Sequence, residues 1–467
     1  MRNKKRKMEP FSFYDHTGIS KHLEKMASQG WMIEKMSNFG WIYQKIEPQK
    51  LHFSVTYYPK ASEFDPEPSE EQKRFYDFCE YTGWKLACAS AQMQVFYNEM
   101  ENPTPLETDP VLEVDILHKA CKKTLFPGLV ALLLIMLLNF GTTALNIYLD
   151  PISFFATPVK LGTILCYIIV FIYCTAELTT YFIWYIKAKK AAENDIFLET
   201  PNSSILQKTL LICTIVILLY WTVPLILSDS IGRITVILSF LYMTSLIYLV
   251  NAIKNYLKHR KTATGTNRII TFLSSFILSF AMMIALTFFT FWGINHGLFH
   301  SDEETYKHNG ETFVLHNDEL PLSVEDIFDV KYDGYNKELR TNESFLLAEY
   351  VIRQHGRFDA ENYKEMPILD YTIVVVKAPF LYDICKTELF NRGDNTWDSS
   401  WPDEMVCTYK SIDPTIWKAK EAYTLYFADG TLDNRYLICY EDYMIDIDFD
   451  RELTDEQIAI IVEKLAH

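Results

Sequence analysis

The sequence predicts a multi-pass α-helical membrane protein with an α+β soluble domain at each end. Five long apolar stretches fill the middle of the 467-residue chain, and the segments on either side mix helix and strand patterns. Each stretch has 19 to 26 residues: 124–149, 161–186, 209–227, 234–253 and 269–292. At a rise of about 1.5 Å per residue, a helix of that length crosses a hydrocarbon layer of about 30 Å.

Basic residues near the ends of these stretches predict an orientation. Lysine and arginine are frequent before the first stretch, between the second and third, and between the fourth and fifth. They are scarce in the other two loops, and the fifth stretch is followed by Asp302, Glu303 and Glu304. Basic residues are retained on the cytoplasmic side. We therefore expect a plasma-membrane protein with a cytoplasmic N-terminus and an extracellular C-terminus.

Charge separates the two soluble domains. The expected organisation is a cytosolic domain at 1–118, a five-helix membrane region at 119–298 and an outer domain at 299–467. The net charge is −16, and residues 300–467 carry 36 Asp and Glu against 16 Lys and Arg. An acidic outer domain argues against binding of nucleic acid or anionic lipid. We expect the lipid bilayer as a partner and no direct contact with nucleic acid.

The N-terminal region reads as a weak repeat of helix and strand patterns. Strand, helix, two strands, helix and strand are expected in the order 11–14, 19–29, 32–46, 51–58, 68–82 and 85–98. Each helix ends at a Gly-Trp pair, Gly30-Trp31 and Gly83-Trp84, where glycine terminates a helix and tryptophan supplies core. This βαββαβ order predicts a ferredoxin-like antiparallel sheet with both helices on one face. Asp15 is expected to cap the first helix.

These residues also carry a family resemblance. The opening Phe11-x-Phe13-Tyr14-Asp15, the following Gly18 and the two Gly-Trp pairs resemble the bacterial family catalogued as domain of unknown function 2812. The resemblance covers about the first hundred residues and implies a cytosolic domain followed by membrane spans. It also implies association with PadR-like transcriptional repressors, and so a protein partner on the cytosolic side. The family has no established activity, so the resemblance transfers no catalytic residue.

The outer region is also expected to be α+β. Leu369–Val376 reads as a buried strand, and a helix is expected over 381–392. Asp429-Gly430 marks a hairpin turn, and the capping box beginning at Thr454 opens a last helix. Nucleophile-elbow, zinc-protease, phosphate-loop and dinucleotide motifs are all missing from the sequence. We expect no enzyme activity, no catalytic residue and no cofactor.

A histidine pair is a weak metal candidate. His296 and His300 share a helix face at i, i+4 if the fifth helix continues, a spacing that suits a divalent metal. The favoured alternative is a polar collar at the membrane interface, so no metal site is assigned.

Glu177 is the acidic residue that lies within a predicted span. Ionisable groups inside membranes are costly and often mark function. Three interpretations remain open: a neutral glutamate hydrogen-bonded to a neighbouring helix, a proton- or cation-related role, and structural coupling between helices.

The cysteines of the outer region leave a disulfide open. Cys385, Cys407 and Cys439 allow one disulfide and one free thiol, and nothing in the sequence selects the pair.

These observations favour a non-enzymatic sensing or regulatory protein that couples an outer domain to a cytosolic one. The alternative is a transporter or transporter accessory subunit that uses Glu177, although the lack of evident repeated halves weakens it. A membrane enzyme is the third hypothesis.

Overall fold

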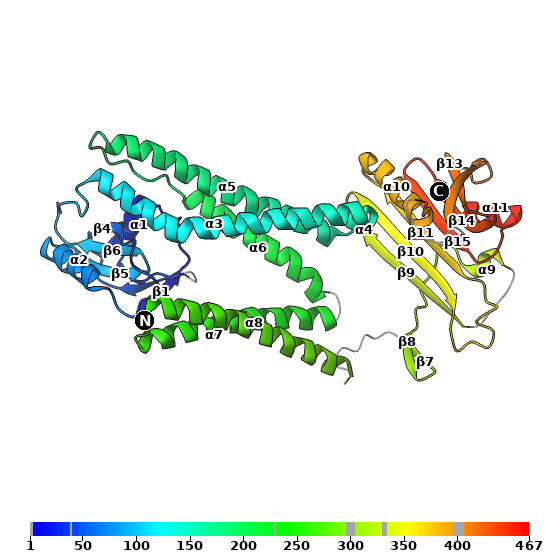
Figure 1. Cartoon of the computed structure of the whole chain (residues 1–467), viewed down its shortest axis with the longest axis horizontal. Coiled ribbons are helices and arrows are strands. Elements are labelled where there is room, and N and C mark those ends of the chain that lie inside the picture. The colour runs from blue at the N-terminus through cyan, green and yellow to red at the C-terminus, as the bar shows by residue number, and fades with distance from the viewer. Residues whose placement is uncertain are drawn as a thin grey trace. The chain divides into compact units, whose positions relative to one another are not determined.

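A computed structural model describes residues 3–37, 40–227, 230–295, 304–328, 334–396 and 406–466. The chain forms two compact units. The first contains Met1–Leu138 and Cys166–Phe299, and the second contains Asn139–Leu165 and His300–His467 (Figure 1). Each unit is therefore built from two separate parts of the sequence.

Long apolar helices occupy the middle of the chain. They are α3 (Pro110–Leu149), α5 (Pro158–Ala192), α6 (Ser204–Leu227), α7 (Ser230–His259) and α8 (Thr264–Asn295). Among the described residues, α3, α5, α7 and α8 are long and apolar enough to cross a membrane, judged by length and composition. Four of the five predicted spans are thus confirmed as candidate spans. The remaining predicted span, 209–227, lies in α6. Its apolar part, Ser204–Tyr220, is shorter than the helices that qualify.

The N-terminal region consists of two copies of the same β-α-β-β unit. The first copy is β1 (Lys4–Lys7), α1 (His16–Ser28), β2 (Trp31–Lys35) and β3 (Trp41–Lys45). The second is β4 (His52–Tyr57), α2 (Glu70–Tyr81), β5 (Lys85–Ser90) and β6 (Met93–Asn98). Each copy forms a three-stranded antiparallel sheet, ordered β1-β3-β2 and β4-β6-β5. The weak repeat in the sequence therefore corresponds to a repeat in topology.

The predicted ferredoxin-like βαββαβ order is wrong. The segment 11–14 is a loop, and the first strand is formed by the basic residues Lys4–Lys7. The two runs expected to be single extended segments each fold back as a hairpin. Gly40 adopts φ +106° directly before β3, and Ala91 adopts φ +50° between β5 and β6. Positive φ values reverse the chain in tight turns, so each run supplies two short strands.

The two Gly-Trp pairs are equivalent at glycine and different at tryptophan. Gly30 and Gly83 end α1 and α2 with φ +83° and +90°, the left-handed conformation that glycine adopts without strain. Trp84 is buried and donates from Nε1 to the Thr104 carbonyl at 2.9 Å. Trp31 is only partly buried, with Lys5 Nζ 5.4 Å from its ring centre. The expectation that both tryptophans are equivalent core residues is wrong.

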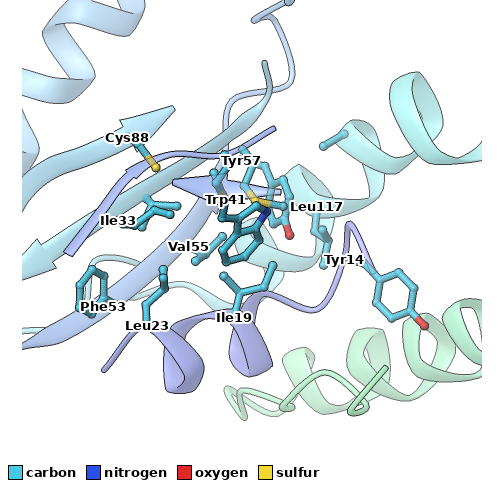
Figure 2. Close-up of a cluster of buried hydrophobic side chains, with 14 of the residues drawn as sticks. Tyr14, Ile19, Leu23, Ile33, Trp41, Phe53, Val55, Tyr57, Cys88 and Leu117 are labelled. Carbon is cyan, nitrogen blue, oxygen red and sulfur yellow. The ribbon is translucent and has the colours of Figure 1, made fainter. Parts of the chain in front are cut away.

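The core of the N-terminal region lies between α1 and the strand β4. Ile19 and Leu23 of α1 are buried against Phe53 and Val55 of β4, which alternate along the strand (Figure 2). The first turns of α3 belong to the same core, with Leu117 1% exposed. The expected domain boundary at residue 118 falls inside this continuous helix.

The C-terminal region is built on one seven-stranded antiparallel sheet in the order β12-β13-β14-β15-β11-β10-β9. Its strands are β9 (Tyr335–Glu343), β10 (Leu347–Gly356), β11 (Leu369–Val376), β12 (Cys407–Ile412), β13 (Glu421–Phe427), β14 (Leu432–Cys439) and β15 (Tyr443–Phe449). The shorter elements are α4 (Pro151–Ala156), β7 (Thr305–His308), β8 (Glu311–Val314), α9 (Val324–Ile327), η1 (Pro379–Leu381), α10 (Tyr382–Gly393) and α11 (Asp455–Leu465). The expected strand at Leu369–Val376 is confirmed.

Helices cover both faces of this sheet. Residues of α9 and α11 pack with Ile445 and Ile447 of β15 in one buried cluster. Residues of α10 and α4 pack with Met444 of the same strand in another. Because successive strand residues point to opposite faces, the two clusters lie on opposite sides of the sheet. The sequence also correctly predicted the Thr454 capping box and the turn at Gly430, which has φ +89°.

Candidate functional site

The loop before α1 is held by Asp15. Its carboxylate caps the helix, accepting a hydrogen bond from the Gly18 backbone N–H at 2.9 Å. A Cβ added at Gly18 would lie 2.5 Å from Asp15 Oδ1. The close approach of the carboxylate therefore requires glycine three residues after the aspartate. The predicted capping role of Asp15 is confirmed.

Asp15 also binds the loop between α5 and α6. Thr200 Oγ1 donates to Oδ1 at 3.0 Å, and Ser203 donates to Oδ2 from its backbone N–H at 3.1 Å and from Oγ at 2.8 Å. The side chain is completely buried. A carboxylate saturated by four donors is an acceptor that holds its neighbours in place. We call the contact of Asp15 with Gly18, Thr200 and Ser203 the Asp15 lock.

Neighbouring residues reinforce the Asp15 lock. The Ser12 backbone N–H donates to Ser203 Oγ at 2.9 Å. Thr17 and Thr200 exchange two hydrogen bonds between backbone N–H and side-chain hydroxyl, at 3.3 and 3.2 Å. Sequence reasoning missed these partners. Thr200 and Ser203 are ordinary polar loop residues, and nothing in their local pattern indicates a contact with a segment more than 180 residues away.

Glu177 lies on α5 beside the same loop. It is 1% exposed, and its carboxyl group contacts the Ser12 and Gln207 side chains. Gln207 Nε2 donates to Ser12 Oγ and to the Tyr173 hydroxyl, both at 2.9 Å. Glu177 Oε2 has no hydrogen-bond partner among the described residues. Glu177 therefore joins α5, α6 and the N-terminal loop in one buried polar cluster.

Tyr14 completes the contact with α5. Its ring is fully buried and packs edge-on against Tyr181 at 5.2 Å and in parallel with Trp184 at 6.5 Å between ring centres. Burial, together with the nearby carboxyl groups of Glu177 and Asp15, raises the pKa of the Tyr14 phenol well above its ordinary value. The phenol is therefore neutral at physiological pH and acts as a packing group.

A second loop of the N-terminal region binds the adjoining ends of α7 and α8. Glu63 pairs with Lys254 at 2.9 Å, and Asp65 accepts a hydrogen bond from Thr264 Oγ1 at 2.6 Å. Between them, the Phe64 carbonyl accepts from Asn267 Nδ2 at 3.1 Å. The N-terminal region thus contacts two different connections of the helix bundle.

In the second unit, the short helix α4 packs on the C-terminal sheet. Ile152 and Ala156 are fully buried in the cluster formed by α10 and the sheet. The Ile152 backbone N–H donates to Glu388 Oε2 at 2.6 Å, and Ser344 Oγ donates to the Phe155 carbonyl at 2.6 Å. The connection between α3 and α5 is therefore part of the C-terminal domain's own core.

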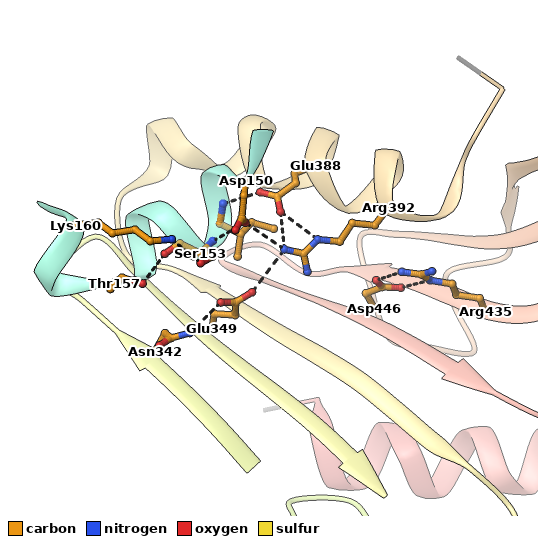
Figure 3. Close-up of polar contacts among 11 residues, drawn as sticks. Asp150, Ser153, Thr157, Lys160, Asn342, Glu349, Glu388, Arg392, Arg435 and Asp446 are labelled. Atoms are coloured by element: carbon orange, nitrogen blue, oxygen red, sulfur yellow. Dashed lines mark hydrogen bonds and ion pairs between the residues drawn. The ribbon is translucent and has the colours of Figure 1, made fainter. Parts of the chain in front are cut away.

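Arg392 lies close to three acidic side chains around α4 (Figure 3). Its Nη2 lies 2.5 Å from Glu388, 3.6 Å from Glu349 and 3.8 Å from Asp150. Burial raises the pKa of the Glu388 carboxyl despite the neighbouring guanidinium. One cation thus stabilises three carboxylates from α10, β10 and the start of α4.

The histidine pair and the cysteines of the C-terminal region were the candidates for a metal site and a disulfide. His296 and His300 lie outside the described residues. Within the described ranges, no group of three His, Cys, Asp or Glu side chains could hold a metal ion. Cys385, Cys407 and Cys439 are buried, and these three residues are not joined in a disulfide.

The comparison with known families identifies the N-terminal region. Residues 15–128 match the family model described as protein of unknown function DUF2812. The match begins at Asp15 and ends inside α3, so it contains Gly18, both Gly-Trp pairs and the Glu63–Asp65 loop. The resemblance seen in the sequence is confirmed. No curated protein and no solved structure matches the chain.

Proposed function

We propose that this chain is a non-enzymatic sensing or regulatory protein of the plasma membrane that couples an outer domain to a cytosolic domain. The observation that carries the proposal is the Asp15 lock. A buried carboxylate of the DUF2812 region accepts three hydrogen bonds from the connection between two apolar helices. If α5 or α6 moved, the contact with Asp15 would either break or move the N-terminal region together with the helix. The packing of α4 into the C-terminal sheet provides a corresponding attachment for the other domain.

Five spans with a cytoplasmic N-terminus form part of this proposal. The N-terminal region contacts both the α5–α6 and the α7–α8 connections. Two loops separated by two helices lie on the same side of a membrane only if both helices cross it or neither does. Since α7 is a candidate span, the contacts support α6 as a span too. Lysines also flank both connections, with Lys189, Lys190 and Lys208 in the helices beside the first and Lys254, Lys258 and Lys261 at the second, which supports a cytoplasmic location.

Cysteine labelling of intact cells tests the orientation. Glu80 of α2 and Glu456 of α11 are exposed, and each would be replaced by cysteine and treated with a membrane-impermeant maleimide. We expect Glu456→Cys to react in intact cells and Glu80→Cys only after permeabilisation. The parent chain, with its nine native cysteines, sets the background. The opposite labelling pattern would reverse the proposed topology.

Hydrogen exchange tests the coupling. Arg392→Ala loosens α4 from the C-terminal sheet, and Arg340→Ala removes an exposed arginine of the same domain as a control. In the full chain in lipid nanodiscs, we expect Arg392→Ala to speed amide exchange at residues 11–18 and 199–203, and Arg340→Ala to leave it unchanged. Faster exchange confined to 139–165 and 300–467 would contradict coupling.

A protein of this kind is expected to pass its signal to a protein partner in the cytosol. The family resemblance points to a PadR-like regulator as that partner. Affinity capture of the full chain from membranes of its own host, compared with the Asp15→Asn variant, tests this proposal. Recovery of a PadR-like protein with the parent chain supports it, whereas equal recovery from mock membranes contradicts it.

Transport remains the second candidate because of Glu177. Its Oε2 is buried and has no hydrogen-bond partner in the described part of the chain, and a titrating carboxyl group inside a bundle can carry protons or cations. Glu177→Gln keeps the shape and hydrogen bonds of the side chain, while Glu177→Leu removes them. Under coupling, the Gln variant should function and the Leu variant should fail. If both fail while reaching the membrane normally, transport becomes the better explanation.

A further inference from the structure

A cleft of about 550 Å³ lies in the N-terminal region. Its walls come from the start of α1, the strand β4, the loop 101–107 and the first turns of α3, and Phe197 of the α5–α6 connection also lines it. Cavities of this size accommodate small organic molecules. The cleft therefore has the dimensions of a ligand site.

The cleft is lined by acidic side chains without basic lysine or arginine partners. The residues that line the cleft include four glutamates, and none is lysine or arginine: Glu24, Glu101, Glu107 and Glu113. Among the described residues, none of these four forms an ion pair with a lysine or arginine. Elsewhere in the same unit, glutamates do find lysines, as in Glu34–Lys4, Glu67–Lys261 and Glu99–Lys85. His52 lies 3.8 Å from Glu24, and burial raises the pKa of Glu113 to about 7. The cleft thus concentrates four carboxyl groups that no lysine or arginine of the described residues pairs with.

Two polar groups in the cleft are only partly satisfied. Glu107 accepts one hydrogen bond, from Thr56 Oγ1 at 2.7 Å, and burial raises the pKa of its carboxyl group. His16 Nε2 is shielded from solvent and lies 3.4 Å from Glu113 Oε1, and no described residue forms a hydrogen bond with it. Burial lowers the pKa of His16 to about 4, so the imidazole is neutral and does not compensate the glutamates. Burying polar groups without partners is unfavourable, and a bound cation would relieve that cost.

The remaining lining mixes polar residues, among them Ser20, Ser54 and Asn102, with apolar and aromatic ones. Trp84, Leu106 and Phe197 face the same space as the glutamates. In the described part of the chain, no three potential ligands converge closely enough for a metal ion. Carboxylates spread over a cleft that is partly apolar suit an extended cation, and an aromatic face adds cation–π attraction. We propose that this cleft binds an organic cation, an amine or quaternary group carried on an apolar body.

The site lies next to the Asp15 lock. His16 and Thr17 line the cleft and directly follow Asp15, and Thr17 is hydrogen-bonded to Thr200. A ligand against these residues would act on the segment that joins the N-terminal region to α5 and α6. A signalling role for the bound ligand rests on the proposed coupling function, whereas binding of the ligand to the cleft does not.

Binding of radiolabelled tetraphenylphosphonium to the full chain tests the site. The chain would be reconstituted in phosphatidylcholine nanodiscs, with empty nanodiscs as the background. We expect saturable binding that benzyltrimethylammonium displaces and that neutral benzyl alcohol does not. Binding equal to that of empty nanodiscs, or equal displacement by the neutral compound, overturns the proposal. Displacement by millimolar Mg²⁺ alone would show a diffuse charge effect and would also overturn it.

Variants locate the binding. The double variant Glu107→Gln with Glu113→Gln should weaken binding at least about tenfold, or about 1.4 kcal/mol, because it removes two carboxyl groups that would pair with the cation. Glu80→Gln on the exposed face of α2 is the matched control and should bind as the parent. If the double variant does not fold, Glu101→Gln on the exposed loop should still weaken binding about threefold. Unchanged binding in a folded cleft variant contradicts the site.

The result is separate from the coupling experiment. Loss of the organic-cation site leaves the exchange response to Arg392→Ala untouched. Absence of that exchange response likewise leaves cation binding measurable.

Discussion

Ser203 donates a 2.8 Å hydrogen bond from Oγ to Asp15 Oδ2 across 188 positions of sequence. The two residues belong to segments that are both polar loops by local pattern, one before α1 and one before α6. Their contact, with Thr200 beside it, joins the DUF2812 region to the helix bundle. Sequence reasoning assigned Asp15 a local capping role, and the structure adds a long-range one.

Replacing Asp15 tests this contact. Asp15→Ala leaves the buried donors of Gly18, Thr200 and Ser203 without an acceptor, so we expect a loss of about 3 kcal/mol in the free energy of unfolding of the N-terminal region. Limited proteolysis of the full chain in detergent should then cut the 193–203 connection faster. Asp77→Asn on the exposed face of α2 is the control. Equal proteolysis of both variants would show that the contact does not contribute to stability.

Arg392 should be essential to the fold around α4. Arg392→Met leaves Glu388 and Glu349, which are 9% and 5% exposed, without their cation. Removing one partner of a buried ion pair costs about 3 kcal/mol or more, so the melting temperature of the C-terminal domain should fall. Replacing Glu388 by Gln in the same chain should recover part of the loss, because one uncompensated charge is removed. A double variant less stable than Arg392→Met would contradict this account.

The two Gly-Trp tryptophans should respond differently to truncation. Trp84 is 4% exposed and hydrogen-bonded, so Trp84→Ala should cost about 3–5 kcal/mol. Trp31 is partly buried and contacts Lys5, so Trp31→Ala should cost about 1 kcal/mol. Thermal melts of the full-length variants measure both. Equal shifts would restore the equivalence that the sequence suggested.

His16 should make the N-terminal region less stable in acid. Its folded pKa of about 4 lies below the ordinary value of 6.5, so between these values the unfolded chain binds a proton that the folded chain does not. Stability is then complete above pH 6.5 and falls as the pH decreases toward 4, by about 3 kcal/mol for a shift of this size. Amide exchange in α1, followed from pH 7 to 4.5, should accelerate beyond the intrinsic rate. His16→Gln should flatten this pH dependence, and an unchanged profile would assign it to other groups.

Much of the secondary structure could be predicted because its causes are local. An apolar stretch longer than about 20 residues predicts a candidate span, and α3, α5, α7 and α8 meet that expectation. The face of α1 that carries Ile19 and Leu23, the capping box at Thr454 and the turn at Gly430 depend on residues within one or two turns of each other. Each of these features follows from spacing along the chain.

The predicted secondary structure was wrong where a run of strand-forming residues contained a turn. The 32–46 and 85–98 runs are rich in residues that favour strands, and alternation alone does not show where a chain reverses. Positive φ at Gly40 and Ala91 decides that each run is a hairpin. The repeat was visible in the two Gly-Trp pairs, but its β-α-β-β topology was not.

By itself, the sequence determined the apolar helices, the acidic C-terminal region and the family resemblance of the N-terminal region, since composition and near-neighbour spacing are sufficient for each. Only the tertiary structure decided which loops meet. It placed Thr200 and Ser203 on Asp15, Ser12 and Gln207 on Glu177, and Glu388 and Glu349 on Arg392. A hydrogen bond between segments far apart in sequence depends on the packing of everything between them, and polar loop residues carry no local mark of the partner that they will bind.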